Sequence, residues 1–359
     1  MNKSKSIRKI LLLVLIIFLI LMLLPSSMQT VYAADYTASD EGELIANLAL
    51  AAASGGGNVT TSANFSISSS SIITIPADCT LLIHHTITNN GTIANNGTII
   101  VNGTITNNGA FTNNVGTFPD NGVIFIVGTM TNNGTFTNGG GTIVIICVDE
   151  DENDVIFGNG TINNNGKIIN HSGTIFKYEG STIINNSGGT IDNYDEILSG
   201  GAITNNGMMI NHNGGVIENY NDGTITNSGT IINHNGGAIN NEGAMTNNDT
   251  ITNDGEIVSN GTITNNGRLN SDGEIYNDGM FINNGKFVGN GLTYNYNNGT
   301  LTGYIPTGHG HIHDFGGTVT LIDNRTFFER LPIIVYIVLI VGLVLAVLAA
   351  FILYRKRKK

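Results

Sequence analysis

The chain has 359 residues, of which 47 are glycine and two are cysteine, and its formal net charge is −12 at pH 7. Two cysteines cannot supply the disulfide framework of a small secreted scaffold. An excess of acidic residues argues against a nucleic-acid-binding protein, because that function needs basic patches. These two classes are therefore set aside.

Residues 1–33 have the pattern of a secretory signal peptide. Basic residues precede an apolar stretch from Ile10 to Leu24, and a small-residue cleavage site ends at Ala33. The apolar stretch is short for a membrane span. We expect export with removal of this segment; an uncleaved N-terminal anchor is the alternative.

The segment 34–85 is expected to hold one helix and then strands. An N-cap residue and an acidic first turn predict a helix over 39–53, and a run of three glycines ends it. Strand-like pieces follow at 58–60 and 71–83. We interpret this segment as the cap of the repeat region that comes next.

A six-residue repeat dominates residues 86–302. Its consensus is Gly-Thr-Ile-x-Asn-Asn, as in Gly103–Asn108. Six is even, so in an extended chain the Ile and the first Asn of each repeat share one face, and Thr and the second Asn share the other. Ile then supplies an apolar core and Asn-Asn-Gly a corner, whereas the recurrent Gly and Asn exclude a helix. Glycines at this spacing are Gly91, Gly97, Gly103, Gly109, Gly255, Gly261, Gly267, Gly273, Gly279, Gly285 and Gly291.

Such repeats predict an all-β fold, a single-chain parallel β-helix. Gly207–Gly215 recurs as Gly229–Gly237, 22 residues later, so one turn takes roughly 18–22 residues. Stacked turns place Ile above Ile and Asn above Asn, which builds the core and satisfies buried polar groups. At about 4.8 Å per stacked strand, residues 86–302 would form on the order of ten turns and a rod of roughly 50 Å.

The opening of the chain resembles the N-terminal cap of bacterial and archaeal surface proteins, adhesin-like ones included, that have right-handed parallel β-helices of the pectin-lyase-like fold. The resemblance rests on the helix followed by an Ile-Pro-Ala-x-x-Thr-Leu phrase at 75–81, and it covers about Ala34 to Thr302. It implies a right-handed solenoid whose open end a helix caps. The perfect hexad is also similar to left-handed β-helices, which the pair Ile93 and Gly97 would fit; the cap favours the right-handed form.

Residues 331–354 are apolar and long enough for a transmembrane helix. Five basic residues, 355–359, follow at once, so the positive-inside rule keeps them in the cytoplasm and places the solenoid outside, on a stem at 303–330. The layout also resembles a sortase sorting signal, but Leu331-Pro332 is followed by two isoleucines instead of the family motif. We expect a retained single-pass anchor in the lipid bilayer of the cell membrane.

Between the two ends lie six basic and all 27 acidic residues, a net charge of −21. Such a surface suits a soluble, mutually repelling coat. The distant Cys79 and Cys147 are expected to be buried small residues rather than a disulfide. Glycosylation sequons are abundant because Asn-Gly-Thr recurs at the repeat junction, which makes a glycoprotein possible. They include Asn58, Asn64, Asn90, Asn96, Asn102, Asn133, Asn159, Asn260, Asn298 and Asn324.

Three histidines alternate at His309, His311 and His313, just after the repeats. In a strand they would share one face, which predicts a metal site; a polar segment with accidental alternation is the alternative. The acidic run 149–154 lacks the spacing of an EF-hand loop, so we expect a solvated loop there. No organic cofactor is predicted.

His171, His212 and His234 occupy the same slot of the repeat, which parity places outside. With Tyr194 and Tyr220 nearby they predict a polar outer stripe suited to hydroxyl-rich ligands, and plain solvated decoration is the alternative.

We predict a membrane-anchored cell-surface rod with a structural or adhesive role, which contacts glycans, host cells or neighbouring cells. Pectate-lyase relatives share the suspected fold, but fold does not imply function, and the repeat region offers no recognisable catalytic pattern. We therefore expect no enzyme. The alternative is a polysaccharide-binding or polysaccharide-degrading β-helix protein. Ice binding by outward Thr arrays is a third possibility, against which the Asn, Lys and Glu interruptions of the array argue.

Overall fold

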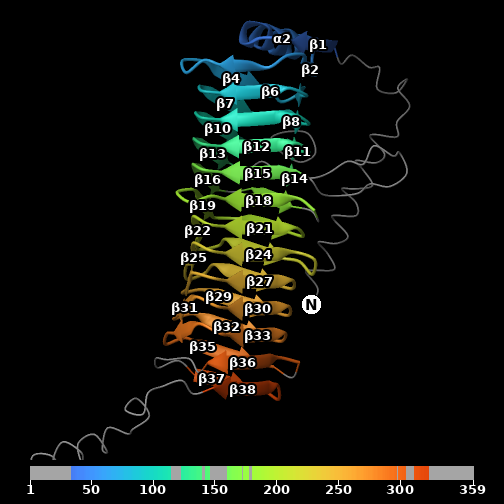
Figure 1. The fold of residues 1–359 in the computed structure, drawn as a ribbon. Helices are drawn as coiled ribbons and strands as arrows, with labels where there is room; N and C mark the ends of the chain where they lie inside the picture. Colours follow the sequence, from blue (N-terminus) through green and yellow to red (C-terminus); the bar gives the residue numbers. More distant parts are fainter. Residues whose placement is uncertain are drawn as a thin grey trace, which may run out of the picture.

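The computed structural model describes residues 34–114, 123–139, 142–145, 160–171, 173–177, 180–296, 298–304 and 311–322. Within these ranges the chain is a parallel β-solenoid of about 13 turns (Figure 1). A typical turn gives one strand to each of three sheets, and each strand pairs in parallel with the strand one turn further along the chain. The predicted all-β solenoid is confirmed.

The three sheets have 14, 13 and 11 strands among the described residues and are named A, B and C. Sheet A consists of β1 (Ala34–Ala38), β2 (Gly57–Thr61), β5 (Cys79–Ile83), β8 (Thr98–Val101), β11 (Val123–Ile126), β14 (Thr142–Ile145), β17 (Thr174–Lys177), β20 (Glu196–Ser199), β23 (Val216–Asn219), β26 (Ala238–Asn241), β29 (Glu256–Ser259), β32 (Glu274–Asn277), β35 (Leu292–Asn295) and β37 (His311–Asp314). Sheet B consists of β3 (Phe65–Ile67), β6 (Thr86–Asn89), β9 (Thr104–Asn107), β12 (Thr129–Asn132), β15 (Thr161–Asn164), β18 (Thr182–Asn185), β21 (Ala202–Asn205), β24 (Thr224–Asn227), β27 (Ala244–Asn247), β30 (Thr262–Asn265), β33 (Met280–Asn283), β36 (Thr300–Tyr304) and β38 (Thr318–Ile322). Sheet C consists of β4 (Ile72–Ile75), β7 (Thr92–Asn95), β10 (Ala110–Asn113), β13 (Thr135–Asn138), β16 (Lys167–Asn170), β19 (Thr190–Asn193), β22 (Met208–Asn211), β25 (Thr230–Asn233), β28 (Thr250–Asn253), β31 (Arg268–Ser271) and β34 (Lys286–Val288).

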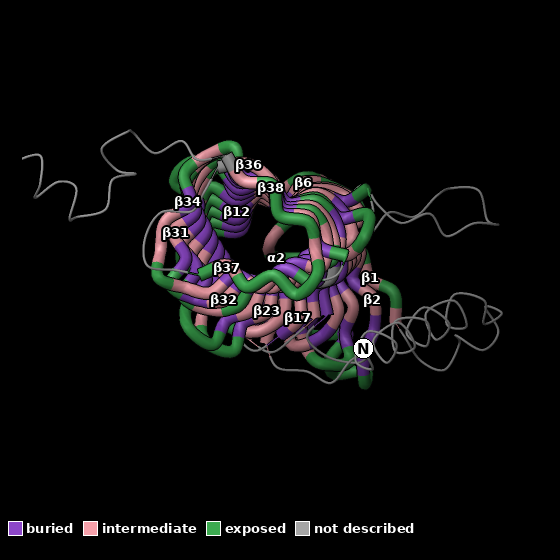
Figure 2. Tube along the Cα trace, turned by 90° about the horizontal axis from the view of Figure 1, so that it is seen from below, coloured by how far each residue is buried: buried purple, intermediate pink, exposed green. Residues whose placement is uncertain are grey.

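The second and fourth residues of a typical strand point into the solenoid. Ile87 of β6 pairs in register with Ile105 of β9, and both are fully buried. Aromatic residues take the same slot in sheet C, where the rings of Phe111 and Phe136 are 5.1 Å apart. Looking along the stack, Figure 2 shows exposed residues gathered at the corners. The even length of the repeat therefore gives the inside and outside positions that parity predicts.

The fourth position carries two long ladders of buried asparagines, one at the end of sheet B and one at the end of sheet C. Shorter runs lie at the end of sheet A, where Asn219 donates to Asn241 and Asn277 to Asn295. In each ladder the Nδ2 of one Asn donates to the Oδ1 of the Asn one turn on, as from Asn205 to Asn227 at 2.7 Å. The sheet B ladder runs through Asn89, Asn107, Asn132, Asn164, Asn185, Asn205, Asn227, Asn247, Asn265 and Asn283. The sheet C ladder runs through Asn95, Asn113, Asn138, Asn170, Asn193, Asn211, Asn233, Asn253 and Ser271.

Ladder asparagines also donate hydrogen bonds to backbone carbonyls at the corners. The Nδ2 of Asn205 donates to the carbonyl of Thr230, which opens the next strand of sheet C, at 2.9 Å, and to that of Gly207 at 3.3 Å. Buried polar groups are costly unless they are paired, so these bonds explain why Asn is tolerated at a fully buried position.

Turn length varies while the ladders stay continuous. Successive Asn residues in the sheet B ladder are separated by 18, 25, 32, 21, 20, 22, 20, 18 and 18 residues. The described strands therefore stay in register whatever the length of the turn. Strand pairing also extends beyond the predicted limits of 86 and 302, from β1 to β38.

The helix expected over 39–53 is present as α2 (Glu41–Ala53). Of the two residues predicted as N-cap, Ser39 and Asp40, the structure uses Asp40. Its side chain accepts from the Glu43 amide at 2.8 Å, while the Glu43 carboxylate accepts from the Ser39 amide. Leu44, Leu48 and Ala51 are its buried residues. The helix lies at the N-terminal end of the stack, beside β1 and β2 (Figure 1).

Several sequence predictions fall outside the described residues. These are the signal peptide at 1–33, the transmembrane segment at 331–354, the basic tail at 355–359, the acidic run at 149–154 and Cys147. Cys79 is described and is buried. Among the residues that the structure describes, no helix is both long and apolar enough to span a membrane.

The end position of sheet A changes from apolar to polar along the rod, and Lys177 marks the change. Ile83, Val101 and Ile126 hold this slot in earlier turns, whereas Ser199 and asparagines hold it later. The Lys177 side chain is buried, with Ser199 Oγ 3.5 Å from its Nζ. Desolvation lowers the pKa of Lys177 to about 7.

We expect Asn205→Ala to lower the free energy of unfolding by about 2–4 kcal/mol, because several buried partners lose a hydrogen bond together. Urea denaturation followed by circular dichroism measures this loss. Asn206→Ala is the matched control, since Asn206 is the exposed neighbour in the same corner. Equal midpoints for the two variants would contradict the structural role of the ladder.

We expect Lys177→Met to raise the urea midpoint most at and below pH 7. The pKa of Lys177 is lowered in the folded chain, so the folded state resists protonation that the unfolded chain accepts. The buried Lys177 side chain therefore destabilises the fold fully below pH 7, and this destabilisation decreases as the pH rises from 7 toward the pKa of lysine in the unfolded chain. The difference in urea midpoint between Lys177→Met and the parent should therefore decrease between pH 6 and pH 9. A difference that does not change with pH would refute the lowered pKa of Lys177.

Candidate functional site

Four aromatic side chains stack on the outer corner that follows sheet C. His171, Tyr194, His212 and His234 each come directly after a strand, β16, β19, β22 and β25 in turn. Adjacent ring centroids lie 5.4, 3.8 and 5.4 Å apart. Tyr194 and His212 are parallel within 2°, whereas His171 meets Tyr194 edge-on at 78°. We call these four residues the corner stack.

A charged group lies beside the corner stack on the outer face of sheet C. Asp192 stands between Ile169 and Ile210 of the neighbouring strands, and its side chain is only 8% exposed. Lys167 Nζ lies 2.7 Å from Asp192 Oδ2, and His212 Nε2 lies 3.5 Å from Asp192 Oδ1. The hydrogen bond and charge of Asp192 raise the pKa of Lys167. The carboxylate is therefore held by a cation on one side and faces an imidazole on the other.

This arrangement favours binding over acid–base chemistry. His212 Nε2 is buried and makes no hydrogen bond of ordinary geometry to any part of the chain that the structure describes, and one face of the ring is covered by Tyr194. A general base must reach the proton it removes, which this nitrogen does not. Exposed ring edges, the Tyr194 ring and His234 are the parts a ligand could meet.

The structure confirms one part of the predicted outer stripe and corrects another. The three histidines of the Ile-Asn-His slot do lie on one outer corner, and Tyr194 lies among them. Tyr220, which we grouped with them, follows β23 of sheet A and therefore belongs to a different corner. Sequence proximity misled here because one turn places neighbouring repeats on different sheets.

A second aromatic group, missed from the sequence, lies near the C-terminal end of sheet A. We call Tyr276, Tyr294, Tyr296 and Phe315 the tyrosine cluster. The Tyr276 and Tyr294 rings are 4.9 Å apart, and those of Tyr296 and Phe315 are 5.6 Å apart. Tyr296 and Phe315 are 38% and 54% exposed. The signal that could have revealed the cluster is the 18-residue offset between Tyr276 and Tyr294, which is one turn.

Tyr276 is tied to the acidic outer face of sheet A. Its Oη donates to Glu274 Oε2, and this bond is the main cause that raises the pKa of Tyr276. Glu218 lies on the same face, and burial together with Glu242 and Glu196 raises its pKa.

The predicted metal site is described only in part. His311 and His313 lie in β37 and are both exposed, with ring centroids 6.4 Å apart. They share the outer face, as the alternation predicted, whereas His309 lies outside the described residues. No group of three or more His, Cys, Asp or Glu side chains suited to a metal ion occurs within the described part of the chain.

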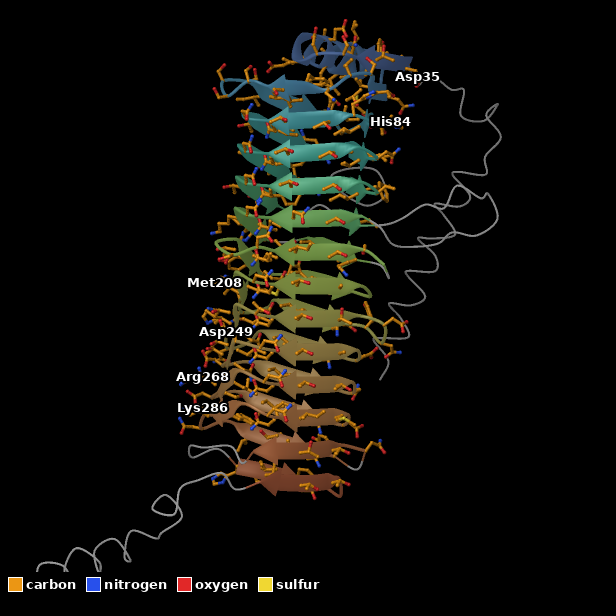
Figure 3. The ribbon with its side chains drawn as sticks, viewed as in Figure 1. Asp35, His84, Met208, Asp249, Arg268 and Lys286 are labelled. Atoms are coloured by element: carbon orange, nitrogen blue, oxygen red, sulfur yellow. The ribbon has the colours of Figure 1, made fainter. Side chains whose placement is uncertain are left out.

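The exposed lysine and arginine side chains of the described residues lie on one face of the rod, that of sheet C, whereas Lys177 of sheet A is buried. Lys167, Arg268 and Lys286 each open a strand of sheet C and are exposed. Figure 3 shows Met208, Arg268 and Lys286 along the same side of the stack. Of these three cations, only Lys167 has an ion pair with a carboxylate among the described residues.

No protein-family model, no curated protein and no solved structure matches this chain. What the corner stack and the tyrosine cluster do must therefore be inferred from their own geometry.

We expect Lys167→Met to lower the free energy of unfolding by about 1–3 kcal/mol, because it leaves the Asp192 carboxylate buried without its cation. Lys286→Met, at the equivalent position of β34, is the control and should stay within about 0.5 kcal/mol of the parent. The double change Lys167→Met with Asp192→Ile should recover stability, since isoleucine would continue the row of Ile169 and Ile210. Urea denaturation provides the measurement, and failure of the double variant to recover would contradict this account of Asp192.

Proposed function

We propose that this chain is a membrane-anchored cell-surface rod with a structural and adhesive role. The observation that carries the proposal is the unbroken stack of about 13 turns, through which the two buried ladders run. At about 4.8 Å per turn, such a stack spans roughly 60 Å. A stiff object of this kind can hold a binding surface away from a membrane.

The two ends of the rod are part of the same proposal. Residues 331–354 would anchor it in the cell membrane as a single span, with the tail 355–359 in the cytoplasm, after export directed by residues 1–33. At the other end, α2 would cap the open end of a right-handed solenoid, because an uncovered strand edge invites pairing with other chains. The acidic surface would keep neighbouring rods apart and soluble.

The adhesive part of the proposal rests on the corner stack. It offers imidazole nitrogens, a phenol and ring edges in a row with the spacing of the turns, and such amphipathic groups suit hydroxyl-rich ligands. Sequon asparagines such as Asn90, Asn133 and Asn260 are exposed at other corners, so attached glycans would point away from the core. We propose glycans or glycan-bearing cells as the partner.

The alternative is a polysaccharide-binding or polysaccharide-degrading β-helix protein. The tyrosine cluster beside the Glu274 carboxylate favours it, because aromatic rings offer an apolar face and the carboxylate offers hydrogen-bond acceptors to a hydroxyl-rich ligand. We also propose that His309, His311 and His313 bind a metal ion, either as part of this alternative or in the stem. Retention of the chain on immobilised zinc, compared with a triple Ala variant, tests this proposal.

A glycan panel, with and without Ca²⁺, tests the proposal on residues 34–330. Saturable binding that Tyr194→Ala with His234→Ala reduces at least about tenfold, and that Tyr294→Ala leaves unchanged, would support adhesion through the corner stack. The reverse pattern, or sugar cleavage, would support the alternative. A folded sample that binds nothing would refute adhesion and leave a passive spacer.

A further inference from the structure

Two kinds of corner join the strands, and they differ in the hydrogen bonding and packing of their Asn-Gly pairs. Tight corners have two residues between strands, as Asn266-Gly267 between β30 and β31. Wide corners have four, as in 234–237 between β25 and β26. Asn-Gly is the dipeptide in which the glycine nitrogen most readily attacks the asparagine side chain, because glycine offers little steric hindrance.

In most tight Asn-Gly corners the glycine nitrogen donates a hydrogen bond to a carbonyl one turn back. Gly267 N donates to the Asn247 carbonyl one turn back at 3.1 Å, and Asn266 N donates to the same oxygen at 2.7 Å. The peptide plane is also packed against the previous corner, since a Cβ on Gly267 would lie 2.1 Å from the Asp249 carbonyl oxygen. Seven tight Asn-Gly corners share both features, with N···O distances from 2.7 to 3.1 Å; their glycines are Gly103, Gly109, Gly134, Gly166, Gly261, Gly267 and Gly285. Gly97 and Gly207 are packed in the same way, but no hydrogen bond from either nitrogen is found among the described residues.

The wide corner at Asn235-Gly236 lacks both features. Both residues are exposed, and the turn is closed by the next amide, from Gly237 N to the His234 carbonyl at 2.8 Å. No hydrogen bond from Gly236 N is found among the described residues. The groups that a Cβ on Gly236 would meet belong to the side-chain amide of Asn213, which can move, rather than to backbone. Gly236 has φ +79°, so it is held in the left-handed region outside the strand ladder.

The equivalent corner one turn earlier is intermediate. Asn213-Gly214 also projects, with Gly214 at φ +85°, but Gly214 N donates to the Gly236 carbonyl at 3.0 Å. The two wide corners thus differ by one hydrogen bond on the attacking nitrogen.

We propose that Asn235 is a site of spontaneous covalent modification, while the seven tight corners with a hydrogen-bonded glycine nitrogen protect their asparagines. The Gly236 nitrogen attacks Cγ of Asn235, the new N–Cγ bond forms and the Cγ–Nδ2 bond breaks. The glycine proton leaves with the amide as ammonia, which yields a succinimide. Water then opens either carbonyl, so the net change is uptake of one water and loss of one ammonia, and the product is aspartate or isoaspartate.

Conversion of Asn235 changes an exposed corner and leaves the buried core of the solenoid unchanged. Asn235 belongs to neither ladder, so the buried hydrogen bonds stay intact. The product adds one negative charge next to His234, a member of the corner stack. Modification would therefore alter the candidate binding surface with time, although the inference itself does not depend on the proposed function.

Peptide-resolved mass spectrometry of the folded full chain, incubated at mildly alkaline pH, tests the proposal. Asn235 should convert at least about tenfold faster than the asparagines of the seven hydrogen-bonded tight corners, the factor that one ordinary net hydrogen bond implies, with Asn213 between them. In a urea-unfolded sample all these sites should react at similar rates, because the dipeptide is the same. Conversion of Asn235 at the rate of the tight corners in the folded chain, or a rate order that survives in urea, would overturn the proposal.

Discussion

The hydrogen bond from the side-chain amide of one asparagine to that of the next turn is the interaction on which this solenoid depends. A buried amide has two donors and an acceptor to satisfy, and a stack of identical turns satisfies them through the copy above, the copy below and the nearby corner carbonyls. A strand shifted by one residue would turn the amide outward and the Ile with it. The ladder thus fixes the register that hydrophobic contacts alone would specify less sharply, and it does so through turns of 18 to 32 residues.

Much of the fold follows from the hexad because six is an even number. Ile and the first Asn of each repeat therefore always point inward, and Thr and the second Asn always point outward. Ile, Asn and Gly are placed by parity and by corner geometry, so the strands, the buried ladders and the outward histidines could be predicted. What the repeat could not predict are departures from it. Asp192 stands between Ile169 and Ile210, and Lys177 stands where the end slot of sheet A changes from apolar to polar. Their partners, Lys167 and Ser199, come from neighbouring turns. The tyrosine cluster needs the exact turn length to be recognised, since its members come from strands and corners of successive turns.

The interior of the solenoid is uniform, whereas its outer corners vary, and this difference matters for function. The interior specifies a rod, and it constrains corners only where they are tight. Wide corners can therefore vary, and His212, His234 and the unprotected Asn235-Gly236 pair lie at such corners, whereas Tyr194 lies at a tight one. A surface protein built in this way can change its contacts by changing corner residues while the ladders keep the shape.

The most direct test of the ladders is hydrogen exchange of asparagine side-chain amides in the folded chain, followed by NMR after selective ¹⁵N labelling of Asn. The account predicts two classes: amides of ladder residues such as Asn205 and Asn227 that persist in D₂O, and amides of exposed corner residues such as Asn206 that exchange at once. Uniformly fast exchange of all asparagine side chains in a sample with intact β-structure would contradict the buried ladders and the register derived from them.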